Sequence, residues 1–121
     1  MARAELVRIR HGVYAPREAW ASLAPWERYL ARVHAAALAY PDAVFSHESA
    51  AALLGLPTFG DHVTVHVLVP TTGASRSVAG VRTHRSSLDR SIVESGGLAL
   101  TGLGDTAVDL ARHRHPAIGA A

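Results

Sequence analysis

Eight histidines are the residues of this chain best suited to metal binding or proton transfer, because imidazole nitrogens serve in both. His62 and His66 are four residues apart in a segment that alternates like a β-strand, so they share a face but lie about 13 Å apart. That distance is too long for one ion. His113 and His115 are two residues apart at an expected helix end and do not face each other. No carboxylate cluster or His-Glu-x-x-His pattern accompanies these pairs, so the spacing predicts no metal site.

A Ser-His-Glu run at residues 46–48 has the residue types of a hydrolase, but adjacent side chains diverge and cannot assemble a triad. Ser46 suits a helix N-cap, where its hydroxyl would accept a hydrogen bond from a free backbone N–H. His47 is expected to be a partly buried hydrogen-bonding residue. The glycine pairs lack the pattern of a phosphate loop, and the chain has no Lys for a nuclease constellation. We therefore predict no catalytic residue, no cofactor and no enzymatic activity.

The segment from residue 44 to residue 70 is expected to organise the fold. A short helix should begin after Ser46 and end at Gly55, which suits the left-handed residue at a helix terminus. Val63, Val65 and Val67 then alternate with polar residues, which is typical of a half-buried strand.

Further elements flank this centre on both sides. A helix should begin at Pro25, a strand should run from residue 78 to residue 84, and paired glycines at 96 and 97 predict a hairpin. Helical spacing predicts that two apolar stripes line the core: Trp26, Leu30, Val33 and Ala37, with Tyr29 and Leu38 widening that stripe, and Leu103, Ala107, Leu110 and Ala111. The predicted fold class is α+β, with a small mixed sheet packed by two or three helices.

A basic segment precedes these elements, at residues 1–16. Arg8, Arg10 and His11 interleave with apolar residues, and Gly12 permits a turn, so we expect a β-hairpin. One interpretation is a basic ribbon that touches a phosphate backbone, which makes these three residues the candidate DNA-binding residues. The other is an edge hairpin whose arginines keep it soluble.

The composition fits one small domain. The chain has 121 residues, of which 49% are hydrophobic, a mean hydropathy of +0.13 and a formal net charge of +2. This mild basicity is compatible with nucleic acid but does not require it. Without cysteine the expected location is the cytoplasm, and no apolar run predicts a membrane span or a signal peptide.

Several segments together resemble the antitoxins of type IV (AbiE-type) toxin–antitoxin systems, in the actinobacterial branch that often carries a Vsr-like endonuclease domain. The resemblance rests on Arg8-Ile-Arg-His-Gly-Val-Tyr-Ala-Pro, Ser46-His-Glu-Ser-Ala-Ala-Ala-Leu-Leu-Gly-Leu-Pro, Val63-Thr-Val-His-Val-Leu-Val-Pro, Gly80-Val-Arg-Thr-His-Arg-Ser, Gly97-Leu-Ala-Leu-Thr and Thr106-Ala-Val-Asp-Leu-Ala. These motifs occur in order over nearly the whole chain.

The resemblance implies two parts. Residues 1–16 look like the wing left from an N-terminal winged-helix domain, which in the family binds DNA and represses its own operon. Residues 17–121 look like the central α+β domain, which in the antitoxins opposes a nucleotidyltransferase-like toxin. The recognition helix and the endonuclease domain are not in the sequence, so the chain looks truncated at both ends. Asp105 also stands where the family usually has an Arg.

Two hypotheses of different class follow from the resemblance. In the first, the chain is a non-enzymatic regulatory module that binds a nucleotidyltransferase-like toxin and contacts the DNA backbone. In the second, it is the central-domain remnant of a Vsr-like endonuclease protein without its catalytic half.

Overall fold

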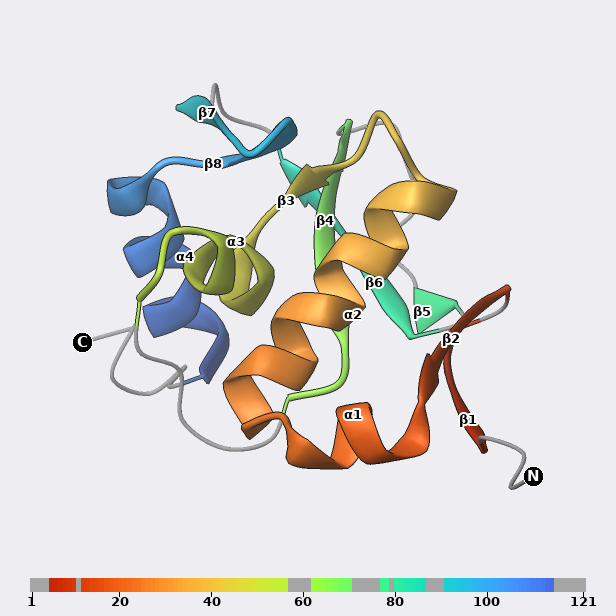
Figure 1. Ribbon diagram of the computed structural model, residues 1–121. Helices are drawn as coiled ribbons and strands as arrows, with labels where there is room; N and C mark the ends of the chain where they lie inside the picture. Colours follow the sequence, from red (N-terminus) through yellow and green to blue (C-terminus); the bar gives the residue numbers. More distant parts are fainter. Residues whose placement is uncertain are drawn as a thin grey trace.

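The computed structural model describes residues 5–10, 12–56, 62–70, 77–78, 80–86 and 91–114. Within these ranges the chain folds as an α+β structure with a mixed sheet, as the sequence predicts (Figure 1). The elements in chain order are β1 (Leu6–Arg10), β2 (Val13–Pro16), α1 (Arg17–Ser22), α2 (Pro25–Ala39), β3 (Val44–Phe45), α3 (His47–Leu53), β4 (Val65–Pro70), β5 (Ser77–Val78), β6 (Val81–Ser86), β7 (Ile92–Ser95), β8 (Leu98–Thr101) and α4 (Leu103–Arg114).

Six strands form the main sheet, in the order β5-β6-β4-β3-β8-β7. Two of its strand pairs, β4 with β6 and β3 with β8, are parallel, and the other pairs are antiparallel. The β7–β8 hairpin confirms the turn predicted at Gly96 and Gly97, which have φ values of 58° and 82°. The predicted strand over 78–84 is divided, because Gly80 makes a turn between β5 and β6 at a φ of 78°.

Three helices pack around this sheet (Figure 1). Helix α2 contacts β4, α3 contacts β4 and β8, and α4 packs against α3. The core between them contains Tyr29, Val33, Ala36, Phe45, Ala50, Val65, Val67, Val81 and Leu100. The small alanines of α2 and α3 let the two helices approach the sheet closely.

The predicted apolar stripe of α2 is partly wrong. Tyr29, Val33 and Ala36 are buried, whereas the side chains of Trp26 and Leu38 are 60% and 77% exposed. Tyr29 reaches α3 and the start of β4 with its hydroxyl. Leu38 lies on the side of α2 opposite Tyr29, and Trp26 lies in the first turn of the helix.

The predicted stripe of α4 is wrong as well. Leu103 is 59% exposed, while the polar residues Thr106 and Asp109 are buried. Thr106 tolerates burial because its hydroxyl lies 2.7 Å from that of Thr101 at the end of β8. Apolar periodicity could not reveal a helix face that is buried through hydrogen-bonded polar side chains.

The central strand is shorter than predicted. Val63 is 55% exposed and lies outside β4, which begins at Val65. The Val65 N–H donates to the carbonyl of Gly80, where the partner strand turns away, and the Thr64 carbonyl accepts a hydrogen bond from Tyr29 Oη. These two contacts end the ladder before Val63.

Among the helices in the described ranges, none is long and apolar enough to cross a membrane.

Candidate functional site

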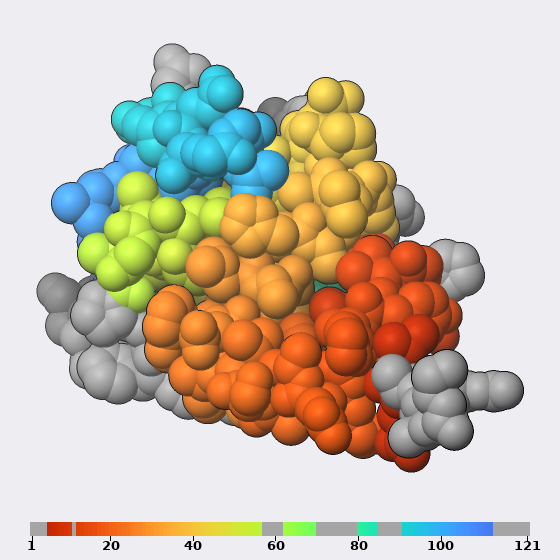
Figure 2. All heavy atoms as spheres, in the orientation of Figure 1, coloured from red at the N-terminus to blue at the C-terminus, as the bar shows by residue number. Residues whose placement is uncertain are grey.

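The N-terminal hairpin is the first candidate site, and the structure confirms its predicted form. Strands β1 and β2 pair antiparallel in a two-stranded sheet of their own, with Gly12 in the turn at a φ of 80°. The hairpin packs against α1 and α2 at one end of the molecule (Figure 2). Burial alternates along both strands, so one face of the hairpin is open.

That open face is a mixture of apolar and basic side chains. Leu6 pairs with Pro16 and Arg8 pairs with Tyr14 across the two strands, and all four residues are exposed. Leu6 and Tyr14 are 57% and 55% exposed, which is high for side chains of this size. We call Leu6, Arg8, Tyr14 and Pro16 the hairpin outer face.

The three predicted DNA-binding residues differ in their surroundings. Arg8 lies on the hairpin outer face. Arg10 is half-buried, and its guanidinium carbon lies 5.3 Å from the centre of the Tyr40 ring, within the range of a cation–π contact. His11 lies outside the described residues. Arg8 is therefore the better placed of the two described arginines to meet a phosphate.

An open pocket of about 450 Å³ lies where α2 ends over the sheet, with Tyr40 in its wall. Val67, Val69 and Val81 supply much of its floor. Because the Arg10 guanidinium lies over the Tyr40 ring, Tyr40 contacts the hairpin and also lines the pocket.

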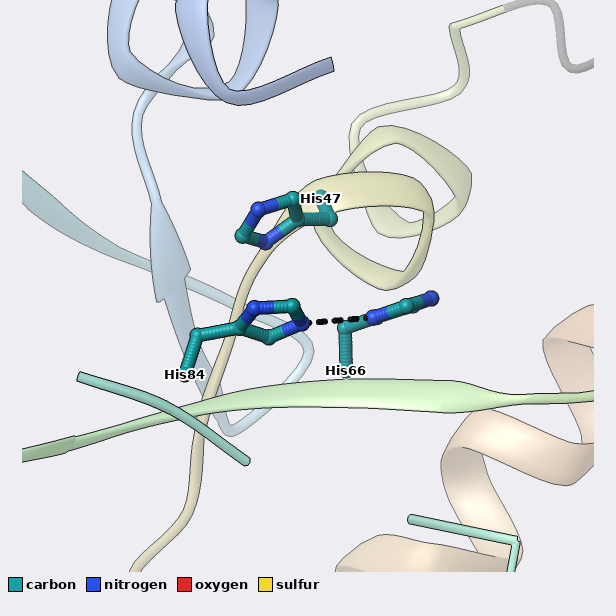
Figure 3. Close-up of side chains that lie close together, drawn as sticks. All are labelled: His47, His66 and His84. Atoms are coloured by element: carbon teal, nitrogen blue, oxygen red, sulfur yellow. Dashed lines mark hydrogen bonds between the residues drawn. The ribbon is translucent and has the colours of Figure 1, made fainter. Parts of the chain in front are cut away.

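The second candidate site is a group of three histidines that lies between α3, β4 and β6 (Figure 3). His47 opens α3, His66 lies on β4 and His84 lies on β6. The side chains of His47 and His66 are buried, and that of His84 is half-buried. One nitrogen from each ring lies within 4.8 Å of the corresponding nitrogens of the other two. We call these residues the histidine cluster.

Strand pairing brings two of these rings together. Because β4 and β6 are parallel with Leu68 opposite His84, His66 and His84 lie diagonally on the same face of the sheet. His66 Nδ1 is 2.8 Å from His84 Nε2, so one of these nitrogens donates a hydrogen bond to the other.

His47 reaches the cluster from the start of α3. Its φ is 53°, a left-handed conformation that is uncommon for any residue other than glycine. Its ring stacks on that of His84 with the centres 4.0 Å apart. Ser46 occupies the predicted N-cap position, but its hydroxyl is 2.8 Å from His47 Nδ1 and does not cap the helix. The predicted capping bond is therefore wrong, because the imidazole takes the hydroxyl.

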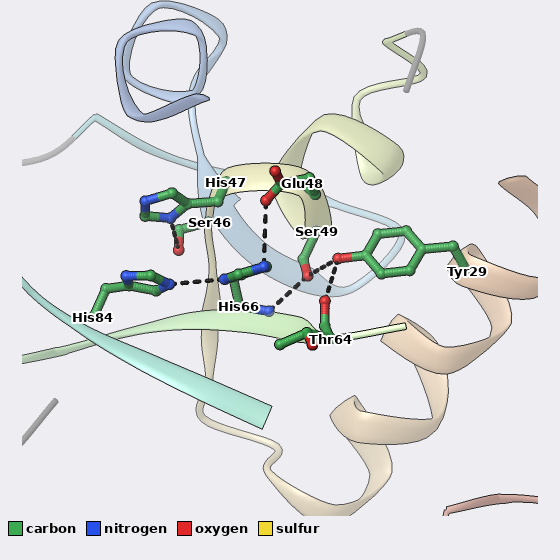
Figure 4. Close-up of polar contacts among 8 residues, drawn as sticks. All are labelled: Tyr29, Ser46, His47, Glu48, Ser49, Thr64, His66 and His84. Carbon is green, nitrogen blue, oxygen red and sulfur yellow. Dashed lines mark hydrogen bonds and ion pairs between the residues drawn. The ribbon is translucent and has the colours of Figure 1, made fainter. Parts of the chain in front are cut away.

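A buried carboxylate stands beside the cluster (Figure 4). Glu48 Oε2 is 3.3 Å from His66 Nε2, and the Glu48 residue is only 5% exposed. A carboxylate at this distance favours a proton on Nε2 of His66. Nδ1 of the same ring then faces His84 as an acceptor, and His84 Nε2 donates.

A chain of hydroxyl groups fixes the backbone below His66 (Figure 4). The His66 N–H donates to Ser49 Oγ over 2.8 Å, and Tyr29 Oη donates to the Thr64 carbonyl over 2.8 Å. Since the Tyr29 hydroxyl proton is used in the hydrogen bond to Thr64, the Ser49 hydroxyl donates to Tyr29 Oη. Burial raises the pKa of Tyr29 above its usual range, although the Ser49 hydrogen bond opposes that shift.

The other histidines singled out in the sequence lie elsewhere. His62 lies before β4, and its ring contacts that of Tyr29 with the ring centres 5.7 Å apart. The side chains of His113 and His115 lie outside the described residues. His47, His66 and His84 are 19 and 18 residues apart; the parallel pairing of β4 with β6 brings His66 near His84, and the packing of α3 on β4 adds His47. Local spacing carries no signal for such a group.

Comparisons of the chain with protein-family models, with curated proteins and with solved structures give no match. The two candidate sites are therefore interpreted from their own geometry and from the motif resemblance.

Proposed function

We propose that this chain is a non-enzymatic, antitoxin-like regulatory module that binds a partner protein through the hairpin outer face. The observation that carries the proposal is the exposure, on one face, of Leu6, Tyr14 and Arg8, which lies opposite Tyr14 and next to Leu6 on that face of β1. Tyrosine and arginine are enriched at protein–protein interfaces, where a flat aromatic ring and a charged fork combine apolar contact with hydrogen bonding. The motif resemblance supplies the kind of partner, a nucleotidyltransferase-like toxin in the cytoplasm.

The same face suits a weaker contact with the DNA backbone. Arg8 can neutralise a phosphate, and backbone contacts carry little sequence information. The proposed DNA contact is therefore non-specific and sensitive to salt. The alternative, a remnant of a Vsr-like endonuclease protein, stays a prediction.

A growth assay tests the partner contact. The proposal requires a nucleotidyltransferase-like protein encoded beside this gene; that protein is co-expressed with the chain in a bacterial host, and the pair is then co-purified. The wild-type chain should restore growth and bind the partner, and the double variant Leu6→Ala with Tyr14→Ala should do neither. Arg112→Ala is the matched control, because Arg112 is exposed on α4, on the opposite side of the molecule from the hairpin (Figure 1).

Each part of the proposal can fail separately. Failure of the wild-type chain to bind or to restore growth would contradict the antitoxin-like function. If the double variant were as active as wild type, the hairpin outer face would not be the contact. A gel-shift titration with the chain's own upstream DNA and a scrambled duplex should show equal affinities, and a clear preference would contradict non-specific binding.

A further inference from the structure

The histidine cluster has the ligand number and the approximate spacing of a transition-metal site. Zinc binds imidazole nitrogens at 2.0–2.1 Å, which in a tetrahedral site places the ligand atoms about 3.4 Å from one another. The His66 Nδ1–His84 Nε2 distance is 2.8 Å, and the longest separation among the three ligand atoms is at most 4.8 Å. The three rings therefore need movements of about 1 Å, together with a rotation of the His47 ring out of its stack on His84, to surround an ion.

His66 already has a carboxylate beside the ring nitrogen that would not bind the ion. In metal sites, the histidine nitrogen that does not bind the ion commonly donates to a carboxylate, which fixes the ring and makes the other nitrogen a better ligand. Glu48 Oε2 lies 3.3 Å from His66 Nε2 and leaves Nδ1 directed at His84. The hydrogen bond from the His66 N–H to Ser49 Oγ holds the backbone of this residue as well.

The surroundings of the cluster also favour the binding of a cation. His47, His66 and Glu48 are 8%, 6% and 5% exposed, so the carboxylate that contacts His66 is buried with the cluster. A divalent ion held by three neutral imidazoles would be partly neutralised by Glu48. Magnesium and calcium prefer oxygen ligands, whereas imidazole suits late first-row metals.

We propose that His47, His66 and His84 bind one Zn²⁺ ion, with Glu48 as the positioning residue of His66. Each histidine supplies one nitrogen. His84 Nε2 gives up its proton when it binds the ion, and the imidazole then carries its proton on Nδ1. The ion ties the start of α3 to β4 and β6, three segments that are distant in sequence, so its binding should stabilise the fold.

Calorimetric titration of the metal-free full-length chain with ZnCl₂ is the first test. We expect one ion per chain with a dissociation constant of about 1 μM or tighter, and a thermal midpoint that rises by several degrees with Zn²⁺ and falls back with a chelator. A Co²⁺-loaded chain should show the intense visible absorption of a tetrahedral site. A wild-type chain that binds neither ion at one equivalent would overturn the proposal without any variant.

Three variants test the location of the site: one at a ligand, one at the positioning residue and one control. His84→Gln keeps a hydrogen-bonding side chain of similar size on the half-buried histidine and should weaken Zn²⁺ binding about 100-fold or more. Glu48→Gln should weaken it about 10- to 100-fold, the usual effect of removing such a carboxylate. His34→Gln is the matched control, because His34 is exposed on α2, and it should bind as wild type does.

Two results from these variants would contradict the proposed location of the ion. Equal affinities for wild type and His84→Gln would place the ion elsewhere. Loss of binding in His34→Gln would indicate a surface site. A far-ultraviolet circular dichroism spectrum accompanies each variant, and the wild-type titration decides the proposal if His84→Gln does not fold.

Discussion

The hairpin and the histidine cluster differ in the burial of their polar side chains. On the hairpin outer face, Arg8 is exposed, and so are its neighbours Leu6 and Tyr14. In the cluster, His66 is buried. Its backbone N–H donates to Ser49 Oγ, and its two ring nitrogens contact Glu48 and His84. The first arrangement leaves groups available to a partner molecule, and the second holds them in a fixed geometry.

This difference separates two kinds of site in one small chain. An exposed mixed surface can change its sequence with little effect on the fold, because few internal contacts depend on it. A buried polar group depends on every partner, because an unsatisfied donor or acceptor in the interior is expensive. Substitutions in the two regions should therefore differ in their effects on the free energy of unfolding.

The largest contrast should come from apolar truncation. Phe45 on β3 is 1% exposed and belongs to the core, so Phe45→Ala should lower the free energy of unfolding by about 3–5 kcal/mol. Leu6→Ala on the hairpin outer face should change it by less than about 0.5 kcal/mol. Urea denaturation followed by circular dichroism measures both. Similar losses for the two variants would mean that the hairpin outer face is covered in solution.

The next effect should appear in alkaline solution. The pKa of Tyr29 is raised in the folded state, while the unfolded chain titrates near pH 10. Below about pH 10 both states keep the proton, and above it the unfolded state loses the proton first. The free energy of unfolding should therefore fall as pH rises above about 10, by up to about 1.4 kcal/mol per pH unit.

Denaturation of Tyr29→Phe and Tyr14→Phe over this pH range checks the assignment. Tyr29→Phe should be less stable than wild type by about 1–3 kcal/mol at neutral pH, because Ser49 and the Thr64 carbonyl lose their partner. It should also lack the share of the alkaline decline that comes from Tyr29. Tyr14→Phe, on the hairpin outer face, should keep the wild-type decline. A wild-type decline in Tyr29→Phe would assign the effect to another group.

The same contrast explains what the sequence could predict. The hairpin was predictable because its signals are local: alternating side chains and a glycine at the turn. Helix α2 was also predictable, from Pro25 at its first position and its helical period. Its buried face was not, since the Tyr29 hydroxyl is held by Ser49 and the Thr64 carbonyl, which are distant in sequence.

The histidine cluster was not predictable because strand pairing assembles it. The register of β4 against β6 places His66 near His84, and no pattern within either strand encodes that register. Ser46 was correctly placed at the start of α3, but the contact of its hydroxyl with the His47 ring depends on the left-handed conformation of His47. The sequence therefore predicted the candidate site made of neighbouring residues and not the candidate site made of distant ones.

A smaller effect should come from the turn of the hairpin. Gly12 has a φ of 80°, and a Cβ added there would meet no atom within 4 Å, so the strain of Gly12→Ala comes from the backbone alone. The variant should lose about 1–2 kcal/mol of stability. Gly104→Ala in α4, which also has space for a Cβ, should instead gain about 0.4–1 kcal/mol. A gain in Gly12→Ala would show that the hairpin turn differs in solution.

The smallest change should distinguish the two arginines of β1. Arg8→Ala removes an exposed charge, so it should leave the thermal midpoint unchanged and flatten the dependence of log K on log salt for duplex DNA by about one unit. Arg10→Ala removes the cation–π contact with Tyr40, so it should lower the thermal midpoint and change the salt slope less. Fluorescence anisotropy of a labelled duplex at several salt concentrations measures the slopes. An unchanged slope in Arg8→Ala would remove the hairpin from DNA binding, and a larger change in Arg10→Ala would mean that its guanidinium leaves Tyr40 for the phosphate.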